Sequence, residues 1–371
     1  MNRRVIALTI LPLSGALMGA VKGDGTPTIG PDKGWLVVHG GGDVTNEVKE
    51  RFVALAGGPH ASFVLIPTAM ADKEIDSEKM RRSFAKEYDV ERVTVLHTRD
   101  RATANSAGFV ESLRHATGVW IKGGRQWRLA DAYLDTAVER EIKWLLARGG
   151  VVGGSSAGAT IQGSFLVRGA PGTPRNPEGD NTIMMSPGHE MGFGLLANSA
   201  IDQHIDARGR VNDLHSVISA HSELLGIGID QSAAIVVHGD SFFVVGGRVA
   251  IHDGKDHDGA PYYFLSSGQG FNLKTRSVDD PQTDEYPLTL AVTAANRMGK
   301  SRTVGSGVLR SRDKSQEPAK VQIECDVSLY SMGNTLYPAR LEGSHEIRIK
   351  AREVNSDKLR ELVCKVSHEN K

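Results

Sequence analysis

Residues 150–160 read Gly-Val-Val-Gly-Gly-Ser-Ser-Ala-Gly-Ala-Thr, an apolar strand that runs into a turn of small residues with a serine at its apex. Within this stretch the pattern Gly-x-Ser-x-Gly falls on Gly154, Ser156 and Gly158. A serine on a sharp strand-to-helix turn exposes its hydroxyl above the sheet edge, and small residues on either side leave room for the backbone. The pattern therefore predicts a nucleophile elbow, with the Ala157 amide placed to donate to an oxyanion.

Apolar runs of strand length precede this elbow and alternate with helical patterns. The expected strands are residues 35–39, 62–66, 92–96, 118–121 and 150–152. The expected helices are residues 47–56, 78–88, 105–115 and 128–146. This alternation predicts an α/β fold with a mostly parallel sheet covered by helices on both faces. Ligands bind such sheets beyond the carboxyl ends of the strands, where the glycine-rich turns at Gly40, Gly123 and Gly153 fall.

The composition restricts the classes of partner. The chain has 371 residues, of which 40% are hydrophobic and 24% are charged, as is ordinary for a soluble globular protein. Its 44 basic and 44 acidic side chains cancel, so there is no net field to attract nucleic acid or an anionic membrane surface. We therefore expect neither as a partner.

The first 20 residues have the pattern of a secretory signal peptide. Two arginines precede an apolar run that begins at Val5, and small residues follow at Ala16 and Ala20. The run is too short and too interrupted for a membrane anchor. We expect residues 1–20 to be removed on export, which makes the mature protein secreted or periplasmic and leaves it without a membrane partner.

Three further regions follow this leader. Residues 21–33 are rich in Gly, Pro and Asp and predict a linker, and the α/β pattern predicts the main domain at residues 34–267. Residues 274–371 predict a small β-rich accessory region, because segments within it alternate apolar and polar residues. Its cysteines, Cys325 and Cys364, are compatible with one disulfide after export, although their number alone does not establish a pairing.

Two segments beyond the elbow carry residues suited to catalysis. Gly124 follows the fourth strand, where its amide is a candidate second oxyanion donor, and Gln126 is placed to reach a substrate. The alternative is an ordinary helix-entry turn. His204 is a candidate general base, and it lies in a segment that includes Asp202, Gln203, Arg208 and Arg210. The two arginines suit a substrate carboxylate, although such clusters also occur on solvated helix faces.

Two more segments end in polar residues. Residues 226–231 predict a buried strand that ends in Asp230 and Gln231, either of which is placed to orient a histidine. Successive strand residues face opposite sides, so only one of the two can serve. Residues 39–43, His-Gly-Gly-Gly-Asp, form either an oxyanion loop or the first turn of the sheet, and we favour the turn.

The order and spacing of these motifs resemble the cyanophycinase-like serine peptidases, relatives of dipeptidase E in peptidase family S51. The resemblance covers about residues 34–245 and implies a flavodoxin-like fold related to class I glutamine amidotransferases. It implies Ser156 as nucleophile, His204 as general base and then acid, and Gln231 as the residue that orients the histidine. The implied substrate-binding residues are Gln126, Asp202, Gln203, Arg208 and Arg210.

The resemblance also implies a substrate class. Members of the family hydrolyse peptide or isopeptide bonds next to aspartyl residues, and cyanophycinases release β-aspartyl-arginine from a poly-aspartate backbone that bears arginine. The expected partner is therefore an aspartyl-containing peptide or a cyanophycin-like polymer. Acyl transfer through a serine needs no metal or organic cofactor. The oligomeric state stays open, a homodimer included.

The chain departs from the family pattern at three positions. Gln231 stands where a glutamate is usual, and an amide adds no negative charge to stabilise an imidazolium. Arg125 replaces an acidic residue that is common after the paired glycines. Asp213 stands where a third arginine is common, which changes the substrate charge that the site tolerates.

Two other functions fit parts of the sequence. The His-Gly-Gly-Gly run with the elbow imitates an α/β-hydrolase esterase, but that fold requires a late catalytic histidine. Only His345 and His368 lie late, both in the charged C-terminal region. A pseudoenzyme that binds acidic peptides without cleaving them is the second alternative, because of Gln231.

Overall fold

The computed structural model describes residues 28–279 in full. Beyond them it describes the backbone of strands at residues 6–10, 288–295, 301–311, 323–329, 345–353 and 359–366. The chain divides into two compact units, one at Lys22–Asp279 and the other formed by Met1–Val21 with Asp280–Lys371. Within the described residues, no helix is long and apolar enough to cross a bilayer.

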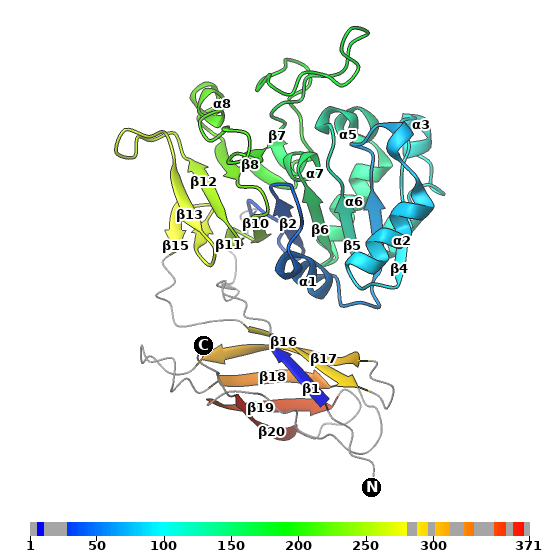
Figure 1. Cartoon of the computed structure of the whole chain (residues 1–371), viewed down its shortest axis with the longest axis vertical. Helices are drawn as coiled ribbons and strands as arrows, with labels where there is room; N and C mark the ends of the chain where they lie inside the picture. Colours follow the sequence, from blue (N-terminus) through cyan, green and yellow to red (C-terminus); the bar gives the residue numbers. More distant parts are fainter. Residues whose placement is uncertain are drawn as a thin grey trace. The chain divides into compact units, whose positions relative to one another are not determined.

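A nine-stranded mixed sheet forms the centre of the larger unit (Figure 1). Its strands, in spatial order, are β15 (Ser277–Asp279), β14 (Gly270–Asn272), β11 (Ser241–Val245), β10 (Ala234–His238), β2 (Trp35–His39), β6 (Val151–Ser155), β5 (Gly118–Ile121), β3 (Ser62–Ile66) and β4 (Arg92–Val95). The five strands from β2 to β4 are parallel, and the four from β15 to β10 pair antiparallel. The parallel half confirms the predicted α/β fold, and the carboxyl ends of β2, β6 and β5 meet at one edge.

Alternate residues of the strands face two separate cores. Val37, Leu65 and Trp120 pack with residues of α1 (Asn46–Leu55) and α2 (Ser77–Glu87). Their neighbours, such as Val38 and Ile66, pack on the other face. The helices there are α4 (Glu111–His115), α5 (Gln126–Tyr133) and α6 (Ala137–Ala147). Because most residues of the central strands are apolar and buried on one face or the other, these strands are nearly continuous apolar runs in the sequence.

A second sheet covers the antiparallel half of the first. It has five strands, β13 (Tyr263–Ser266), β12 (Arg248–His252), β9 (Leu225–Ile229), β8 (Leu196–Gln203) and β7 (Gly163–Phe165). Ile201, Ile227 and Val249 of this sheet share one core with Ile235 and Val244 of the nine-stranded sheet. The sequence pattern did not predict this second layer. It positions the end of β8, where the candidate base lies.

Some helices differ from their predicted bounds. The pattern at residues 128–146 is divided between α5 and α6, because Asp135 adopts a left-handed backbone conformation with φ of 57°. The carboxylate of Glu139 accepts the Asp135 N–H at 2.6 Å and so stabilises the break. The pattern at residues 105–115 contributes only α4, and a short helix, α3 (Arg101–Ala104), precedes it. The remaining short helices are a 3₁₀ turn (Asp72–Glu74), α7 (Ala157–Thr160) and α8 (Leu214–Ala220).

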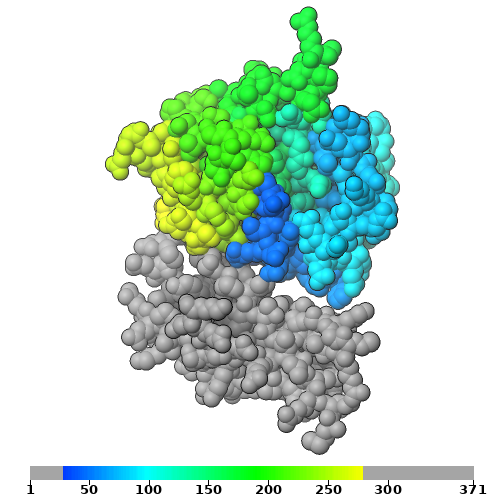
Figure 2. All heavy atoms as spheres, viewed as in Figure 1, coloured from blue at the N-terminus to red at the C-terminus, as the bar shows by residue number. Residues whose placement is uncertain are grey.

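Parts of the predicted linker belong to the larger unit. The amide of Gly30 donates to Gly239 O at 2.8 Å, and Gly239 N donates to Pro31 O. Past residue 267, β14 and β15 extend the nine-stranded sheet. The chain between β7 and β8 projects from the surface of this unit (Figure 2).

The smaller unit is a six-stranded sheet. Its strands, in spatial order, are β1 (Ile6–Ile10), β16 (Leu288–Ala295), β17 (Ser301–Ser311), β18 (Ile323–Leu329), β19 (His345–Glu353) and β20 (Leu359–Val366). This is the β-rich region that the sequence predicts. β1 lies within the predicted leader, whose removal stays a prediction. Cys325 and Cys364 lie on β18 and β20 with β19 between them.

Candidate active site

Ser156 occupies the sharp turn between β6 and α7. Its backbone has φ of 56° and ψ of −115°, a conformation that residues with a Cβ rarely adopt. The Ser156 amide donates to His39 O at 3.0 Å, which ties the turn to β2. A Cβ on Gly158 would lie 2.1 Å from Ile121 O, so a larger residue there would push α7 off the sheet. The elbow therefore needs its small residues.

The imidazole of His204 faces this serine. His204 follows β8, and its Nε2 lies 3.1 Å from Ser156 Oγ. Its backbone also has a positive φ, 55°, and its amide donates to Gly40 O at 3.0 Å. Gly41 has φ of 110°, and a Cβ there would meet the His204 ring at 2.1 Å. The glycine run after β2 is thus a turn, as favoured above, and it packs against the histidine.

Gln231, and not Asp230, faces the other ring nitrogen of His204. Gln231 Oε1 lies 3.3 Å from His204 Nδ1. The Asp230 carboxylate instead accepts from Arg248 Nε at 3.1 Å. With a carbonyl oxygen at Nδ1, the imidazole carries its proton there, and Nε2 is free to accept from the Ser156 hydroxyl.

The electrostatic surroundings keep His204 neutral. Burial lowers the pKa of His204 below its ordinary value, and the nearby Arg208 and Arg210 guanidinium groups lower it further. The hydrogen bond from Gln231 opposes this shift. A neutral imidazole is the form that can accept a proton from a serine hydroxyl.

Two backbone amides lie beside the serine without an acceptor of their own. Ala157 begins α7, so its N–H has no partner within the helix. Gly124 follows β5, and its neighbour Gly123 lies within van der Waals contact of Ser156. Across residues 28–279, neither Gly124 nor Ala157 donates a backbone hydrogen bond. Such amides are suited to an oxyanion.

A second histidine lies behind the nucleophile, and the sequence analysis did not assign it a role. His39 is fully buried at the end of β2, and its Nδ1 lies 3.0 Å from Ser155 Oγ. Burial, with a contribution from His204, lowers the pKa of His39 to about 4. His39 is therefore neutral at physiological pH. Ser155 contacts His39, whereas Ser156 contacts His204, so the two adjacent serines have different partners.

Asp202 and Gln203 lie on β8 next to His204. Gln203 Oε1 is 3.2 Å from Ser156 Oγ, which gives the hydroxyl a second polar neighbour. Asp202 is fully buried and accepts from Gln203 N at 2.9 Å. The carboxylate also accepts two hydrogen bonds from Arg168, each 2.8 Å long. The Asp202 carboxylate thus fixes the backbone amide of Gln203, and Arg168 fixes the carboxylate.

Arg168 also compensates the negative charge at Asp213. Its Nη2 donates to Asp213 Oδ2 at 2.6 Å, and its Nη1 donates to Asn181 O at 2.8 Å. The Arg168 side chain is 2% exposed, so the Asp202 and Asp213 carboxylates share one buried guanidinium. The anion at Asp213 is therefore paired with a cation from the segment after β7. No motif in the sequence connects these two positions.

Arg210 is a buried cation whose charge is stabilised by the nearby Asp202 and Asp213 carboxylates without a direct hydrogen bond to its Nη1 from any described residue. The residue is 9% exposed, and its Nη1 is buried. Arg208 is exposed. Gln126 is buried and donates to Val167 O at 2.9 Å, which ties α5 to the segment after β7. A buried guanidinium with an unused donor is suited to bind an anionic ligand.

Metal-binding clusters are absent from the part of the chain that the structure describes: no three His, Cys, Asp or Glu side chains are grouped there. The site therefore consists of a serine, a neutral histidine, two free amides and a buried guanidinium at the edge of an α/β sheet. This combination can support nucleophilic acyl transfer.

Comparison with known proteins agrees with this class. The family model of peptidase family S51 matches residues 36–245, more than half of the chain. The chain therefore belongs to peptidase family S51, and it is a serine-type peptidase. This membership contradicts the α/β-hydrolase esterase alternative.

Curated relatives narrow the comparison further. The chain is 32% identical to a cyanophycinase from Geminocystis herdmanii over 225 residues, which cover 59% of this chain and 80% of that protein. It is 31% identical to a cyanophycinase from Nostoc sp. over 265 residues, which cover 66% of this chain and 86% of that protein. The crystal structure of a peptidase from an acI-B1 Actinobacterium superposes with a TM-score of 0.51 at 23% identity, covering 66% of this chain and 98% of that one. This likeness supports the fold.

Proposed function

We propose that this chain is a secreted, cyanophycinase-like serine exopeptidase that hydrolyses the bond next to aspartyl residues. Its substrate is a cyanophycin-like polymer, a poly-aspartate backbone that bears arginine. The similarity to cyanophycinases of two organisms supports the substrate class. The signal-peptide pattern of residues 1–20 supports secretion.

One observation carries the catalytic proposal. Ser156 Oγ, the His204 ring and Gln231 Oε1 follow one another at 3.1 and 3.3 Å, the order of nucleophile, base and orienting residue. A serine hydroxyl is a weak nucleophile unless a neighbouring base removes its proton. His204 is neutral and buried, which suits it to that role.

Acylation follows from this arrangement. Ser156 Oγ attacks the carbonyl carbon while His204 Nε2 takes the hydroxyl proton, and the carbonyl electron pair moves to oxygen. The Gly124 and Ala157 amides donate to that oxyanion. Its collapse breaks the C–N bond, and His204 protonates the leaving amine.

Deacylation repeats the steps with water. His204 removes a proton from a water molecule, which attacks the ester carbonyl on Ser156. The ester bond then breaks, the serine recovers its proton from His204, and the aspartyl product leaves as a carboxylic acid. Gln231 holds the Nδ1–H of the ring throughout, so that Nε2 keeps facing the serine.

The linkage of the substrate is tested with three compounds. We expect the mature protein to release β-aspartyl-arginine from a short arginine-bearing aspartate oligomer faster than it cleaves α-aspartyl-leucine or β-aspartyl-leucine. Chromatography of the products gives all three rates. Ser156→Ala protein is the control for contaminating peptidases. If none of the three compounds were hydrolysed, the proposed function would be wrong.

Arg210 is the proposed ligand of the substrate carboxylate. We expect Arg210→Ala to raise KM by about 10-fold with a smaller change in kcat, because a contact of equal strength in ground and transition states affects binding alone. Arg208→Ala should have a weaker effect, since that side chain is exposed. Steady-state kinetics of the two variants, with a substrate that carries a free carboxylate and with its neutral amide, measure these effects. Equal processing of the two compounds by wild type and by both variants would contradict the assignment.

A further inference from the structure

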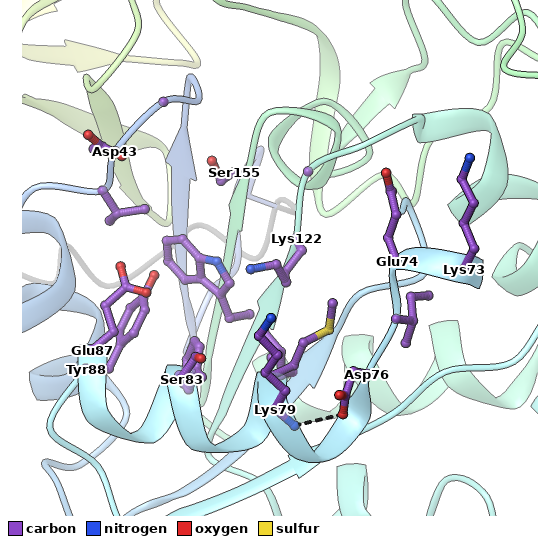
Figure 3. A pocket seen from close by; sticks show the side chains of 18 residues that line it. Asp43, Lys73, Glu74, Asp76, Lys79, Ser83, Glu87, Tyr88, Lys122 and Ser155 are labelled. Carbon is purple, nitrogen blue, oxygen red and sulfur yellow. Dashed lines mark hydrogen bonds between the residues drawn. The ribbon is translucent and has the colours of Figure 1, made fainter. Parts of the chain in front are cut away.

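A pocket lies on the α1–α2 face of the nine-stranded sheet, and its lining includes Ser155, the residue before the nucleophile (Figure 3). Its volume is about 560 Å³, and its rim includes Gly42, Gly123 and Ser155. A Cβ on Gly42 would meet the Gln231 side chain at 2.4 Å, and one on Gly123 would meet Ser156 Cβ at 3.0 Å. The pocket therefore opens directly beside the catalytic residues.

The pocket wall and the strand that leads to Arg210 contribute to different cores of the larger unit. The inner wall of the pocket contains Leu65, Tyr88 and Trp120, which belong to the core beneath α1 and α2. β8, which leads to the Arg210 segment, contributes Ile201 to the core on the opposite face of the sheet. The pocket is thus a second compartment, separate from the Arg210 segment.

Most acidic groups around the pocket are already satisfied. Glu87 pairs with Lys49 at 2.9 Å. Asp76 caps α2 by accepting from Lys79 N at 3.0 Å. Glu74 accepts from a backbone amide at 3.1 Å. These three carboxylates already have partners within the protein, so they are poorly available to bind a ligand.

Four charged side chains of the lining, Lys73 among them, are not committed in this way. The side chains of Lys122, Lys79 and Asp43 form no hydrogen bond or ion pair with any residue in the range 28–279. Figure 3 shows the two lysines projecting into the pocket, Lys122 from the segment after β5 and Lys79 from α2, with Asp43 at the opposite end of the view from Lys73. Lys122 is half-buried and follows Trp120, so its ammonium is held beside an apolar wall.

Such a lining favours a zwitterionic group. Free ammonium groups bind a carboxylate, and a free carboxylate binds a cation such as a guanidinium. Trp120 and Tyr88 are buried and supply only an apolar wall. An arginyl group with a free carboxylate carries both charges on one flexible stem. The proposed substrate has such a group on every aspartate.

We propose that this pocket is the arginyl subsite of the enzyme, with Lys122 and Lys79 as the carboxylate ligands and Asp43 as the guanidinium ligand. This assignment rests on the proposed function for the identity of the substrate. In this assignment two regions of the protein recognise the substrate. Arg210 binds the aspartyl carboxylate, and the pocket binds the arginyl arm.

Binding to Ser156→Ala protein tests the subsite without requiring turnover. The ligands are β-aspartyl-arginine and its C-terminal amide, and calorimetry gives each Kd. We expect the amide to bind about five- to ten-fold more weakly than the acid, because it lacks the carboxylate. In Ser156→Ala/Lys122→Met protein, the Kd of the acid should rise by a similar factor. The Kd values of the acid and the amide should then be equal.

A matched control separates local from general charge effects. Lys86 is exposed on the same helix as Lys79 but does not line the pocket, so Lys86→Met should leave both Kd values unchanged. An acid-to-amide ratio that is unaffected by Lys122→Met, or no binding of either ligand, would overturn the subsite. Normal binding with no turnover by the wild-type enzyme would instead count against the acyl-enzyme proposal.

Discussion

Ser156→Ala should lower kcat by about 10⁴-fold or more, because the variant loses the nucleophile while the oxyanion amides and binding groups remain. The structure supplies a matched control one residue away. Ser155 has the same side chain, but its hydroxyl faces His39 Nδ1 at 3.0 Å and not His204. Ser155→Ala should therefore keep kcat within a few-fold of wild type. Steady-state hydrolysis of the arginine-bearing oligomer measures both variants.

A covalent label tests the same assignment without a substrate. A fluorophosphonate reacts with a serine only when a neighbouring base activates it. We expect the label on Ser156 in wild type and in Ser155→Ala protein, and its absence from Ser156→Ala protein. Mass spectrometry locates the modified peptide. An unlabelled wild type would favour a protein that binds acidic peptides without cleaving them.

The parallel half of the fold could be predicted because each strand is buried on both faces. β2 and β3 have the predicted bounds, since continuous apolar runs of that length have few alternatives in an α/β protein. The helix predicted at residues 128–146 was too long, because Asp135 adopts a positive φ that interrupts it. Nothing in the neighbouring sequence indicates this break. The second sheet escaped prediction because it is mixed, with parallel and antiparallel pairs that join strands from distant parts of the sequence.

The core of the candidate site could be predicted from local motifs. Ser156 and His204 are 48 positions apart, and each lies where a strand of a different sheet ends. Backbone hydrogen bonds from both residues to the end of β2 and its glycine turn bring them together. The sequence left Asp230 and Gln231 as alternatives, because strand alternation excludes one of them without identifying it. The ion pair of Asp230 with Arg248 decides between them.

Other features of the site depend on tertiary contacts that no local pattern encodes. Arg168 and Asp213 form an ion pair from segments 45 positions apart. Because Arg168 is shared with Asp202, the charge of Asp213 also acts on Arg210. His39 lies in the glycine-rich turn that the sequence did identify, but only its burial against Ser155 distinguishes it from a simple strand end.

Gln231 determines how well the protein stabilises the imidazolium that forms during acyl transfer. It contacts Nδ1 at 3.3 Å and supplies an oxygen without a charge. Gln231→Glu should raise kcat by about 10- to 100-fold, less than the ~10⁴ effect of a fully buried carboxylate, because this side chain is exposed to solvent. Asp230→Asn is the matched control and should leave kcat within about two-fold, since Asp230 faces Arg248.

The pH dependence of the same variant separates a charge effect from a change in packing. His204 acts as a base only when it is neutral, so kcat/KM falls as pH drops through the pKa of His204. Burial and Arg208 lower that pKa, so the wild-type acid limb should lie below about pH 6.5. A glutamate at position 231 favours the imidazolium, raises the pKa and moves the limb to higher pH. If Gln231→Glu raised kcat but left the acid limb at the same pH, the new carboxylate would act elsewhere than on His204. If kcat were unchanged, residue 231 would not orient the base.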